Sequence, residues 1–339
     1  MTNAMLRLFG FLWLLTAALP SWVAVAGTLD EVRARGALRC GVSEGIPGFS
    51  ERTGADEWRG LDIDLCRAVT VAVLGQDGKM VPVPLNAKTR FAALKQGQVD
   101  VLIRNTTWTL GREVEHDFAF AGINYFDGQG FLTRQKEGLR SAIQLSKPLI
   151  CVKAGTEAQF HAERYFQRLG VTARFVVADD FDGLRKGFAE GKCDVVSADQ
   201  SQLHGLRPLL RGTVVLPEFI TKEPLGPVVR ADDPAWFKIV KLTLALLVNA
   251  EELGIDSGNV ARVAKVAQSE SVRGMLDLDR YFEGRLRLSP HWARNVIEQI
   301  GNYGESFHRN LGRGSVLHIG RGQNALWSDG GLLYAPPMR

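Results

Sequence analysis

The sequence has few of the residues, and lacks the spacings, that bind metals or nucleotide cofactors. Four cysteines and six histidines occur in 339 residues, no two cysteines have C-x-x-C spacing, and the histidines do not cluster near them. These features argue against a zinc site. The glycine patterns GxGxxG and the P-loop are also absent. We therefore expect neither a metal nor a cofactor.

The sequence also lacks a large excess of one charge and any long apolar run after residue 26. The formal net charge is +4 at pH 7, which is small for this length. Nothing therefore indicates a nucleic-acid or membrane-surface partner. No later segment approaches the roughly 20 apolar residues of a membrane-spanning helix. We expect the processed chain to be soluble and monomeric.

The first 26 residues differ in composition from the rest. They contain one charged side chain, Arg7, followed by the apolar run LFGFLWLLTAAL and by AVA. This arrangement is typical of a secretory signal peptide, and cleavage is expected after Ala26. The alternative is an uncleaved membrane anchor, which the short apolar run and Pro20 disfavour. The remaining length is typical of two domains.

An internal repeat indicates how the remaining chain is organised. Two copies contain strand candidates in the same order: LRCGV (38–42), KMVPVPL (79–85) and the end of LKQGQVDVLIRN (94–105), then LICVK (149–153), ARFVVAD (173–179) and the end of FAEGKCDVVSAD (188–199). Helical periodicity lies between the strands, as in IDLCRAVTVAVLG and EAQFHAERYFQRLG. Gly97 and Gly191 precede the third strand of each copy and suit the residue that follows a helix end.

The repeat predicts an α/β protein with two lobes. Strands that alternate with helices form parallel βαβ units, and ligands bind such open sheets at the carboxyl ends of the strands. Asn105 and Asp199 stand at such ends, one in each copy. The alternative is a coincidental recurrence of G-x-x-D-V, which the matched order of three elements disfavours.

Polar residues follow the strand in VDVLIRNTTWTLGRE without the usual turn chemistry. A free amino acid offers an α-carboxylate, which suits a bidentate donor, and an α-ammonium, which suits an acid. Arg112 supplies the planar fork and Asp199 the acid, while Asn105 and Thr107 can orient both ends. The sequence AGT leads into a helix at Thr156, where backbone N–H groups can bind the same carboxylate.

Each of these residues also has a purely structural interpretation. Arg112 could be a surface or helix-capping residue, Asp199 could cap the helix that begins QSQLHGLR, and Trp108 could pack in the core. The hypothesis of a binding site depends on the combination of residues across both lobes.

Motifs throughout the chain resemble one known family. They are CGVSEGIPGFS, RNTTWTLGRE, FAGINYFDGQGF, CDVVSADQSQL, KEPLGPVVR, NAEELG, GNYGE and the ending ALWSDGGLLYAPPMR. From Thr28 onward the sequence is similar to the periplasmic general L-amino-acid-binding proteins of polar amino-acid ABC importers, in solute-binding protein family 3. The resemblance implies a type II periplasmic-binding-protein fold, in which two lobes with mostly parallel, helix-flanked sheets close about a two-segment hinge.

The resemblance also implies roles for individual residues. The two ends of the ligand would be held by two sets of groups: Arg112, Thr107, Thr156 and the amide of Glu157 for the α-carboxylate, and Asp199 and Asn105 for the α-ammonium. Narrow receptors for basic amino acids surround the side chain with an aromatic pair and an acid, where this sequence has Ile46, Ala87 and Ser43. This departure favours a permissive pocket, which we expect to be bordered by Glu44, Trp108 and Gln200.

The four cysteines of an exported chain indicate disulfides. In the fold that the resemblance implies, Cys40 and Cys66 fall in the first lobe and Cys151 and Cys193 in the second. We therefore expect the pairs Cys40–Cys66 and Cys151–Cys193. A bridge between the lobes would block the hinge motion.

The expected division of the chain is 27–134 for the first part of lobe 1, 135–222 for lobe 2, and 223–339 for the return to lobe 1 with a C-terminal helical extension and tail. Helices are expected over 235–266 and from Ser289 onward.

The expected function is non-enzymatic: a periplasmic receptor captures L-amino acids with broad specificity and delivers them to an ABC permease at the inner membrane, together with its ATPase. The alternatives are a narrow receptor for Glu, Gln, Asp and Asn, a dehydratase or lyase on the same fold, and an additional sensory role.

Overall fold

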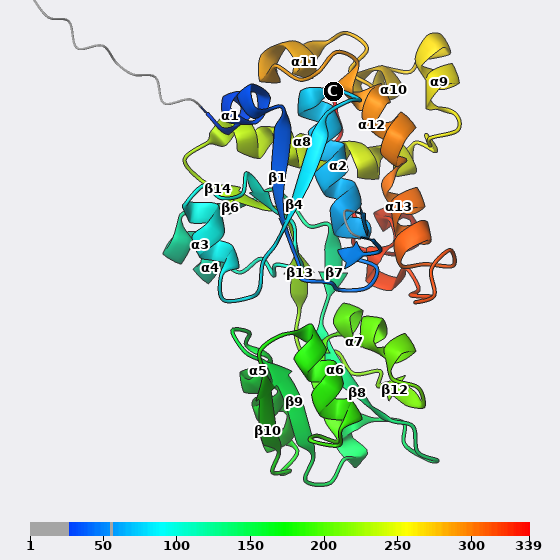
Figure 1. Ribbon diagram of the computed structural model, residues 1–339. Coiled ribbons are helices and arrows are strands. Elements are labelled where there is room, and N and C mark those ends of the chain that lie inside the picture. Colours follow the sequence, from blue (N-terminus) through cyan, green and yellow to red (C-terminus); the bar gives the residue numbers. More distant parts are fainter. Residues whose placement is uncertain (1–26, 55–56) are drawn as a thin grey trace, which may run out of the picture.

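A computed structural model describes residues 27–54 and 57–339. The predicted signal peptide lies outside these residues. Figure 1 shows two lobes, one above the other, each built around a sheet with helices against it. The predicted two-lobed α/β fold is confirmed.

The first lobe contains a five-stranded sheet in the order β4-β1-β5-β14-β6. β1 pairs in parallel with β4 and β5, and β14 is antiparallel to both of its neighbours. The elements of this lobe before the crossing are α1 (Thr28–Arg35), β1 (Ala37–Val42), β2 (Glu51–Arg52), β3 (Trp58–Arg59), α2 (Leu61–Leu74), β4 (Lys79–Pro84), α3 (Arg90–Lys95), β5 (Val101–Leu102), α4 (Leu110–His116) and β6 (Phe118–Phe120).

The second lobe repeats this plan in the order β10-β9-β11-β8-β12. β9 is parallel to β10 and β11, while β8 is antiparallel to both of its neighbours. Its elements are β8 (Gln129–Arg134), β9 (Leu149–Lys153), α5 (Ala158–Arg168), β10 (Arg174–Ala178), α6 (Phe181–Ala189), β11 (Val195–Asp199), α7 (Gln200–Leu206) and β12 (Thr213–Val215).

The two sheets confirm the internal repeat. The strands predicted as equivalent occupy equivalent positions, since β4-β1-β5 of one sheet corresponds to β10-β9-β11 of the other. Gly97 and Gly191 follow the ends of α3 and α6 with φ of +67° and +73°. A side chain would be strained in this left-handed conformation, which explains glycine at both positions.

Two short strands join the lobes. β7 (Tyr125–Asp127) and β13 (Glu223–Leu225) pair in antiparallel orientation between the two sheets (Figure 1). The predicted boundary after residue 134 assigned β8 to the first lobe, and this detail is wrong. β8 is paired on both edges within the second sheet, and its adjacent Phe131 and Leu132 pack in the two hydrophobic clusters of that lobe, so the first crossing lies before Gln129.

Both predicted disulfides are present. Cys40–Cys66 joins β1 to α2, and Cys151–Cys193 joins β9 to the residues that precede β11. Each bridge joins two segments of the same lobe, so neither one crosses the hinge.

After the second crossing the chain returns to the first lobe and adds a helical extension, whose elements are β14 (Val228–Arg230), α8 (Pro234–Glu252), α9 (Val260–Val266), α10 (Glu270–Met275), α11 (Tyr281–Leu286), α12 (Trp292–Ile300) and α13 (Tyr303–Asn310). The helix expected over 235–266 is interrupted, because Gly254 takes the left-handed conformation after α8. The helix expected from Ser289 is also two helices, since Asn302 and Glu305 form a capping box that starts α13. Single 3-10 turns occur at Ala142–Gln144, Arg207–Leu209, Gly322–Asn324 and Trp327–Asp329.

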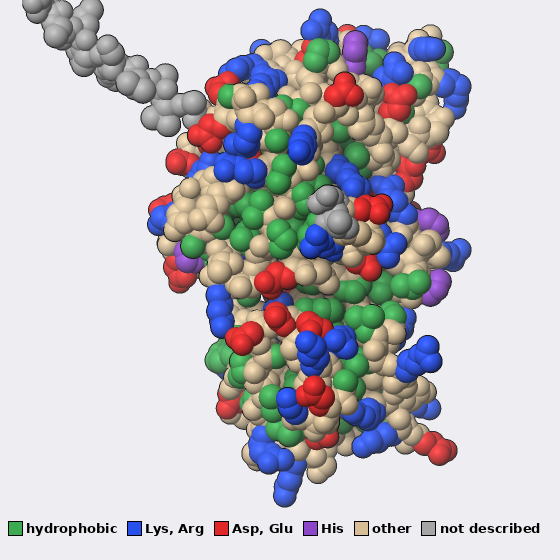
Figure 2. Space-filling view, viewed as in Figure 1, with side chains coloured by type: hydrophobic (Ala, Val, Ile, Leu, Met, Phe, Trp, Pro, Cys, Tyr) green, Lys and Arg blue, Asp and Glu red, His purple; other side chains and the backbone are tan. Residues whose placement is uncertain are grey.

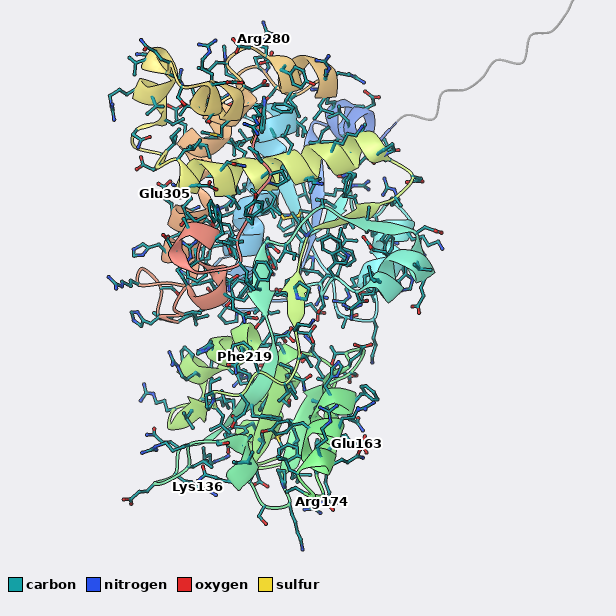
Figure 3. All side chains as sticks on the ribbon, turned by 180° about the vertical axis from the view of Figure 1, so that it is seen from behind. Lys136, Glu163, Arg174, Phe219, Arg280 and Glu305 are labelled. Carbon is teal, nitrogen blue, oxygen red and sulfur yellow. A yellow bond between two sulfur atoms is a disulfide. The ribbon has the colours of Figure 1, made fainter. Side chains whose placement is uncertain are left out.

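A buried carboxylate fastens the extension to the first lobe. Asp64 of α2 accepts hydrogen bonds from the Ser306 hydroxyl at 2.6 Å, from Nη2 of Arg309 at 2.6 Å and from the Asn310 amide at 2.6 Å. Figure 3 shows this region from behind, near the labelled Glu305. No helix in residues 27–54 or 57–339 combines the length and apolar composition that crossing a bilayer requires.

We expect Asp64→Ala to lower the free energy of unfolding by about 2–3 kcal/mol, because it leaves buried donors of α13 without an acceptor. Urea denaturation followed by circular dichroism measures the change. Asp77→Ala is the control: this exposed side chain should change stability by less than about 0.5 kcal/mol. Equal stability of the two variants would show that the extension is held by its apolar contacts alone.

Candidate functional site

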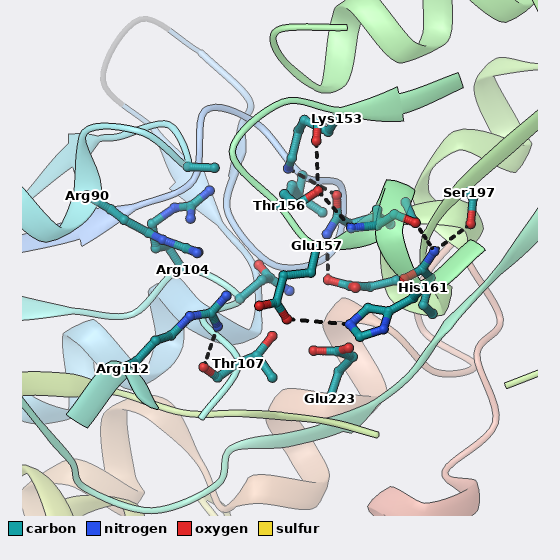
Figure 4. Close-up of a pocket in the computed structure, with 18 residues that line it drawn as sticks. Arg90, Arg104, Thr107, Arg112, Lys153, Thr156, Glu157, His161, Ser197 and Glu223 are labelled. Atoms are coloured by element: carbon teal, nitrogen blue, oxygen red, sulfur yellow. Dashed lines mark hydrogen bonds and ion pairs between the residues drawn. The ribbon is translucent and has the colours of Figure 1, made fainter. Parts of the chain in front are cut away.

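A pocket lies between the lobes, at the carboxyl ends of the strands. Side chains of both lobes line it, and six of them were predicted from the sequence: Asn105, Thr107, Arg112, Thr156, Glu157 and Asp199. Figure 2 shows acidic and basic side chains side by side where the lobes meet, and Figure 4 shows the pocket itself. The position agrees with the general rule for open parallel sheets.

The loop after β5 supplies some of the pocket's groups from the first lobe. Asn105 has φ of +52° and is only 8% exposed, and neither atom of its side-chain amide has a hydrogen-bond partner among the described residues. Thr107 forms a bridge with Leu225 of β13, and the N–H of Trp108 donates to the Pro224 carbonyl at 2.7 Å. The loop is therefore attached directly to a hinge strand.

Arg112 is held by its own helix and by this loop. Its backbone N–H donates to the Thr109 hydroxyl, which caps α4, and its Nη1 donates to the Thr107 carbonyl at 2.6 Å. These bonds keep the guanidinium beside Thr107, at the edge of the pocket (Figure 4).

The start of α5 supplies groups from the second lobe. The helix begins at Ala158 rather than at Thr156, whose hydroxyl donates to the Lys153 carbonyl at 2.7 Å and accepts from the N–H of Ala158 at 3.4 Å. The Glu157 carboxylate lies 3.4 Å from Nε2 of His161. Residues 156 and 157 directly precede the helix, at its N-terminal end, where backbone N–H groups and the helix dipole favour an anion.

The acidic side of the pocket lies near the hinge. Asp199 occupies the N-cap position of α7, but its carboxylate makes no capping bond and instead accepts from the Gln202 amide at 2.7 Å. Burial and the nearby Glu223 carboxylate raise the pKa of Asp199, to about 6. Glu223 also lines the pocket, and its Cα pairs with that of Asp127 across the two hinge strands.

Three residues expected at the border lie elsewhere. Trp108 points away from the pocket because it alternates with Thr107, and its indole stacks on Phe120 with ring centroids 5.6 Å apart. Gln200 is buried behind the pocket, over Gly130, where its amide donates to the Leu216 and Glu218 carbonyls. Glu44 is exposed and does not line the pocket.

Three cations of the pocket were missed. Arg104 lies two residues after the end of β5, and Lys153 is the last residue of β9, so the rule of strand ends that identified Asn105 and Asp199 could have found them. Arg90 is the first residue of α3, and no motif in the sequence around it predicted a pocket residue. Burial lowers the pKa of Arg104 to about 10 and that of Lys153 to about 8.

Other pocket residues were also not anticipated as ligand contacts: Gln129, Ala158, His161, Ser197, Ala198, Gln202 and Glu223. Ile46 and Ala87, identified as replacements for an aromatic pair, both line the pocket. The described residues contain no group of three or more His, Cys, Asp or Glu side chains placed to hold a metal ion.

One segment matches the G-x-S-x-G spacing of hydrolases, at residues 41–45. Ser43 is buried there, and its hydroxyl is hydrogen-bonded to that of Ser50. It is not among the residues that line the pocket. The match therefore reflects the end of β1 rather than an exposed nucleophile.

Comparison with known proteins agrees with this fold. Residues 38–161 match the bacterial extracellular solute-binding proteins, family 3. The chain is 43% identical to the general L-amino acid-binding periplasmic protein AapJ of Rhizobium johnstonii, over 93% of this chain and 94% of AapJ. It is 42% identical to the glutamate/glutamine/aspartate/asparagine-binding protein BztA of Rhodobacter capsulatus, over 95% and 96%. The protein therefore belongs to family 3 of the extracellular solute-binding proteins, as the resemblance predicted.

A solved structure supports the same assignment. An ABC-transporter periplasmic binding protein from Brucella ovis, with glutathione bound, has a TM-score of 0.89 and 43% sequence identity. The match covers 93% of this chain and 100% of that protein. The C-terminal extension is thus shared with a relative of the same size.

Proposed function

We propose that this protein captures free L-amino acids between its two lobes and delivers them to the permease of an ABC importer. The observation that carries the proposal is the placement of Arg112 and Asp199 in one pocket, on opposite lobes. A guanidinium and a carboxylate in these positions match the two charged ends of an α-amino acid.

The pocket residues divide by the end of the ligand that they bind. Arg112 and Thr107 bind the α-carboxylate from the first lobe, and Thr156 with the backbone N–H of Glu157 binds it from the second. Asp199 and Asn105 bind the α-ammonium. The unpartnered amide of Asn105 supports its role, since a buried polar group without a partner is costly unless a ligand satisfies it.

Ligand binding favours closure of the lobes about β7 and β13. We place the lobes at about 27–128, 129–222 and 223–339, the last segment returning to lobe 1. Among the described residues, interactions that cross between the lobes without involving pocket residues include the ion pair of Lys88 with Asp179 at 3.1 Å and the bond from Arg207 to the Leu317 carbonyl at 2.9 Å. A ligand that contacts both lobes stabilises the closed state further.

Broad specificity is supported by Ile46 and Ala87, which leave no aromatic clamp on the side chain. The alternative is a narrow receptor for Glu, Gln, Asp and Asn. A dehydratase or lyase would need an acid–base group, and His161 is the imidazole that lines the pocket. We propose that His161 orients Glu157 and that the ligand is released unchanged.

The proposal includes export of the protein across the inner membrane. A signal peptide removed after Ala26 would place the protein in the periplasm, where the Rhizobium and Brucella relatives are named as residing. The two disulfides fit an oxidising compartment. We propose that the processed protein acts as a monomer.

A thermal-shift screen tests the function. Residues 27–339 are unfolded to remove bound ligand, refolded, and mixed with each of the twenty L-amino acids and with glutathione, using D-enantiomers and 2-oxo acids as controls. We expect several L-amino acids to raise the melting temperature and the controls to have no effect. Mass analysis of the ligand after incubation distinguishes a receptor from an enzyme. If no amino acid stabilises the protein, the proposal is wrong.

The affinity should depend on the ionisation of Asp199. Because its pKa is about 6, the carboxylate is charged at pH 7–8 and takes up a proton as the pH falls below about 6. The ammonium needs the charged form, so affinity should be constant above about pH 7 and fall by up to about tenfold per pH unit below 6. Calorimetric titration from pH 4.5 to 8 measures this. The same fall in Asp199→Asn, which cannot titrate, would assign it to another group.

A further inference from the structure

A buried carboxyl group in the hinge has no part in the ligand contacts proposed above. Asp127 is the last residue of β7, is only 4% exposed, and is not among the residues that line the pocket. Its Oδ2 atom has no hydrogen-bond partner in the described part of the chain. Burial and the nearby Asp199 carboxylate raise the pKa of Asp127 well above its usual range, so its ionised form is unfavourable there. An aspartate in such surroundings calls for a role other than stabilising the fold.

The other oxygen of Asp127 binds the start of α7. Its Oδ1 accepts from the N–H of Ser201 at 3.3 Å and from the N–H of Gly128 at 2.9 Å. The Gly128 carbonyl in turn accepts from the N–H of Gln200 at 2.8 Å. The first two N–H groups of α7, for which the helix itself provides no acceptor, are therefore bound by the end of a hinge strand. Figure 1 shows β7 entering the second lobe near α7.

One of these bonds is the bond that Asp199 would be expected to form. Asp199 occupies the N-cap position of α7, with φ of −58° and ψ of 142°. The side chain of a capping residue usually accepts from the N–H of the second or third helical residue. The second residue of α7 is Ser201, whose N–H is bound to Asp127. The Asp199 carboxylate makes no capping bond and lines the pocket, where it accepts from the Gln202 amide at 2.7 Å.

We infer that Asp127 is a positioning residue for the ammonium end of the ligand, because it caps α7 in place of Asp199 and leaves the Asp199 carboxylate free to face the pocket. This inference rests on the proposed function, which assigns Asp199 to the α-ammonium. Without the Asp127 acceptor, the N–H of Ser201 is buried without a partner, which is unfavourable. Asp199 then turns to cap its own helix, and the ammonium loses its acceptor.

Two substitutions of Asp127 test the inference by calorimetric titration of refolded residues 27–339 with L-glutamine at pH 7.5. Asp127→Ala is expected to weaken binding by about tenfold to a hundredfold, as for the loss of one charge-assisted contact. Asp127→Asn keeps an oxygen that can accept from the same N–H groups, so its affinity should stay within about threefold of that of the unmodified protein.

Asp180→Ala is the matched control. This exposed aspartate caps α6 in the same lobe, where it accepts from the N–H of Gly183 at 2.7 Å, and it does not line the pocket. Its loss should lower the melting temperature but leave the affinity for L-glutamine unchanged. The control thus separates the loss of a helix cap from the loss of a cap that frees a ligand-binding carboxylate.

A double-mutant cycle distinguishes positioning from a general loosening of the lobe. If Asp127 acts through the Asp199 carboxylate, adding Asp127→Ala to Asp199→Ala should weaken binding by less than about twofold further. A general loosening would weaken binding by the same factor with and without the Asp199 side chain. Titration at millimolar L-glutamine gives the affinities of these weaker variants.

The outcomes separate the positioning role from the function. Unchanged affinity in Asp127→Ala would overturn the inference while leaving the receptor intact, and so would a folded Asp127→Asn protein that binds as weakly as Asp127→Ala. If circular dichroism shows that Asp127→Ala misfolds, Asp127→Leu replaces it, since leucine has a similar volume and no acceptor. If L-glutamine does not bind the unmodified protein, L-glutamate takes its place. Absence of binding by any L-amino acid would overturn the proposed function and this inference with it.

Discussion

Arg112→Ala is expected to weaken the binding of every L-amino acid by roughly thirtyfold to several thousandfold, which corresponds to about 2–5 kcal/mol. The guanidinium lies at the pocket edge, fixed by its bond to the Thr107 carbonyl. Without it, the α-carboxylate of the ligand would be desolvated in the closed cleft and would lack its proposed bidentate partner. Calorimetric titration with L-glutamine measures the loss.

Two matched variants make this result specific. Arg112→Lys keeps the charge but not the planar fork, so its affinity should fall between those of Arg112→Ala and the unmodified protein. Arg168→Ala removes an exposed charge near the end of α5, far along the helix from the pocket, and should have no effect. Unchanged binding by Arg112→Ala would mean that the α-carboxylate lies elsewhere in the cleft.

Loss of the Cys151–Cys193 bridge is expected to destabilise the second lobe by about 3–4 kcal/mol. The bridge joins residues 42 apart, and the chain-entropy model gives this magnitude for a closed loop of that length. Both sulfur atoms are buried beside β9 and β11, so the double variant Cys151→Ala, Cys193→Ala avoids adding polar groups to the core. Urea denaturation without reductant measures the free energy of unfolding.

The matched variant for this experiment is Cys40→Ala, Cys66→Ala, in which the lost loop spans 26 residues in the other lobe. It should cost about the same energy, slightly less because the loop is shorter. Ligand affinity should survive in either folded variant, since neither bridge crosses the hinge. A loss below about 1 kcal/mol would indicate that the reduced chain retains structure when unfolded.

The sequence by itself determined the architecture. The matched order of three strands in two copies specified two sheets of the same plan, and the sheets have that plan. The strand-end rule, with the family resemblance, placed six polar residues in what is one pocket: Asn105, Thr107, Arg112, Thr156, Glu157 and Asp199. These features depend on local motifs or on the periodicity of apolar residues, so they can be predicted from the sequence alone.

Only the tertiary structure decided which other side chains enter the pocket. Trp108 follows Thr107 directly, yet alternation along an extended segment turns it outward onto Phe120. β8 belongs to the second lobe because its edges pair with β11 and β12, which periodicity alone does not reveal. Arg90 reaches the pocket only because α3 packs beside the end of β5. Each of these outcomes depends on tertiary contacts, which neither the periodicity of the sequence nor the strand-end rule specifies. The burial of Arg90 and Arg104 is likewise a property of the folded chain alone.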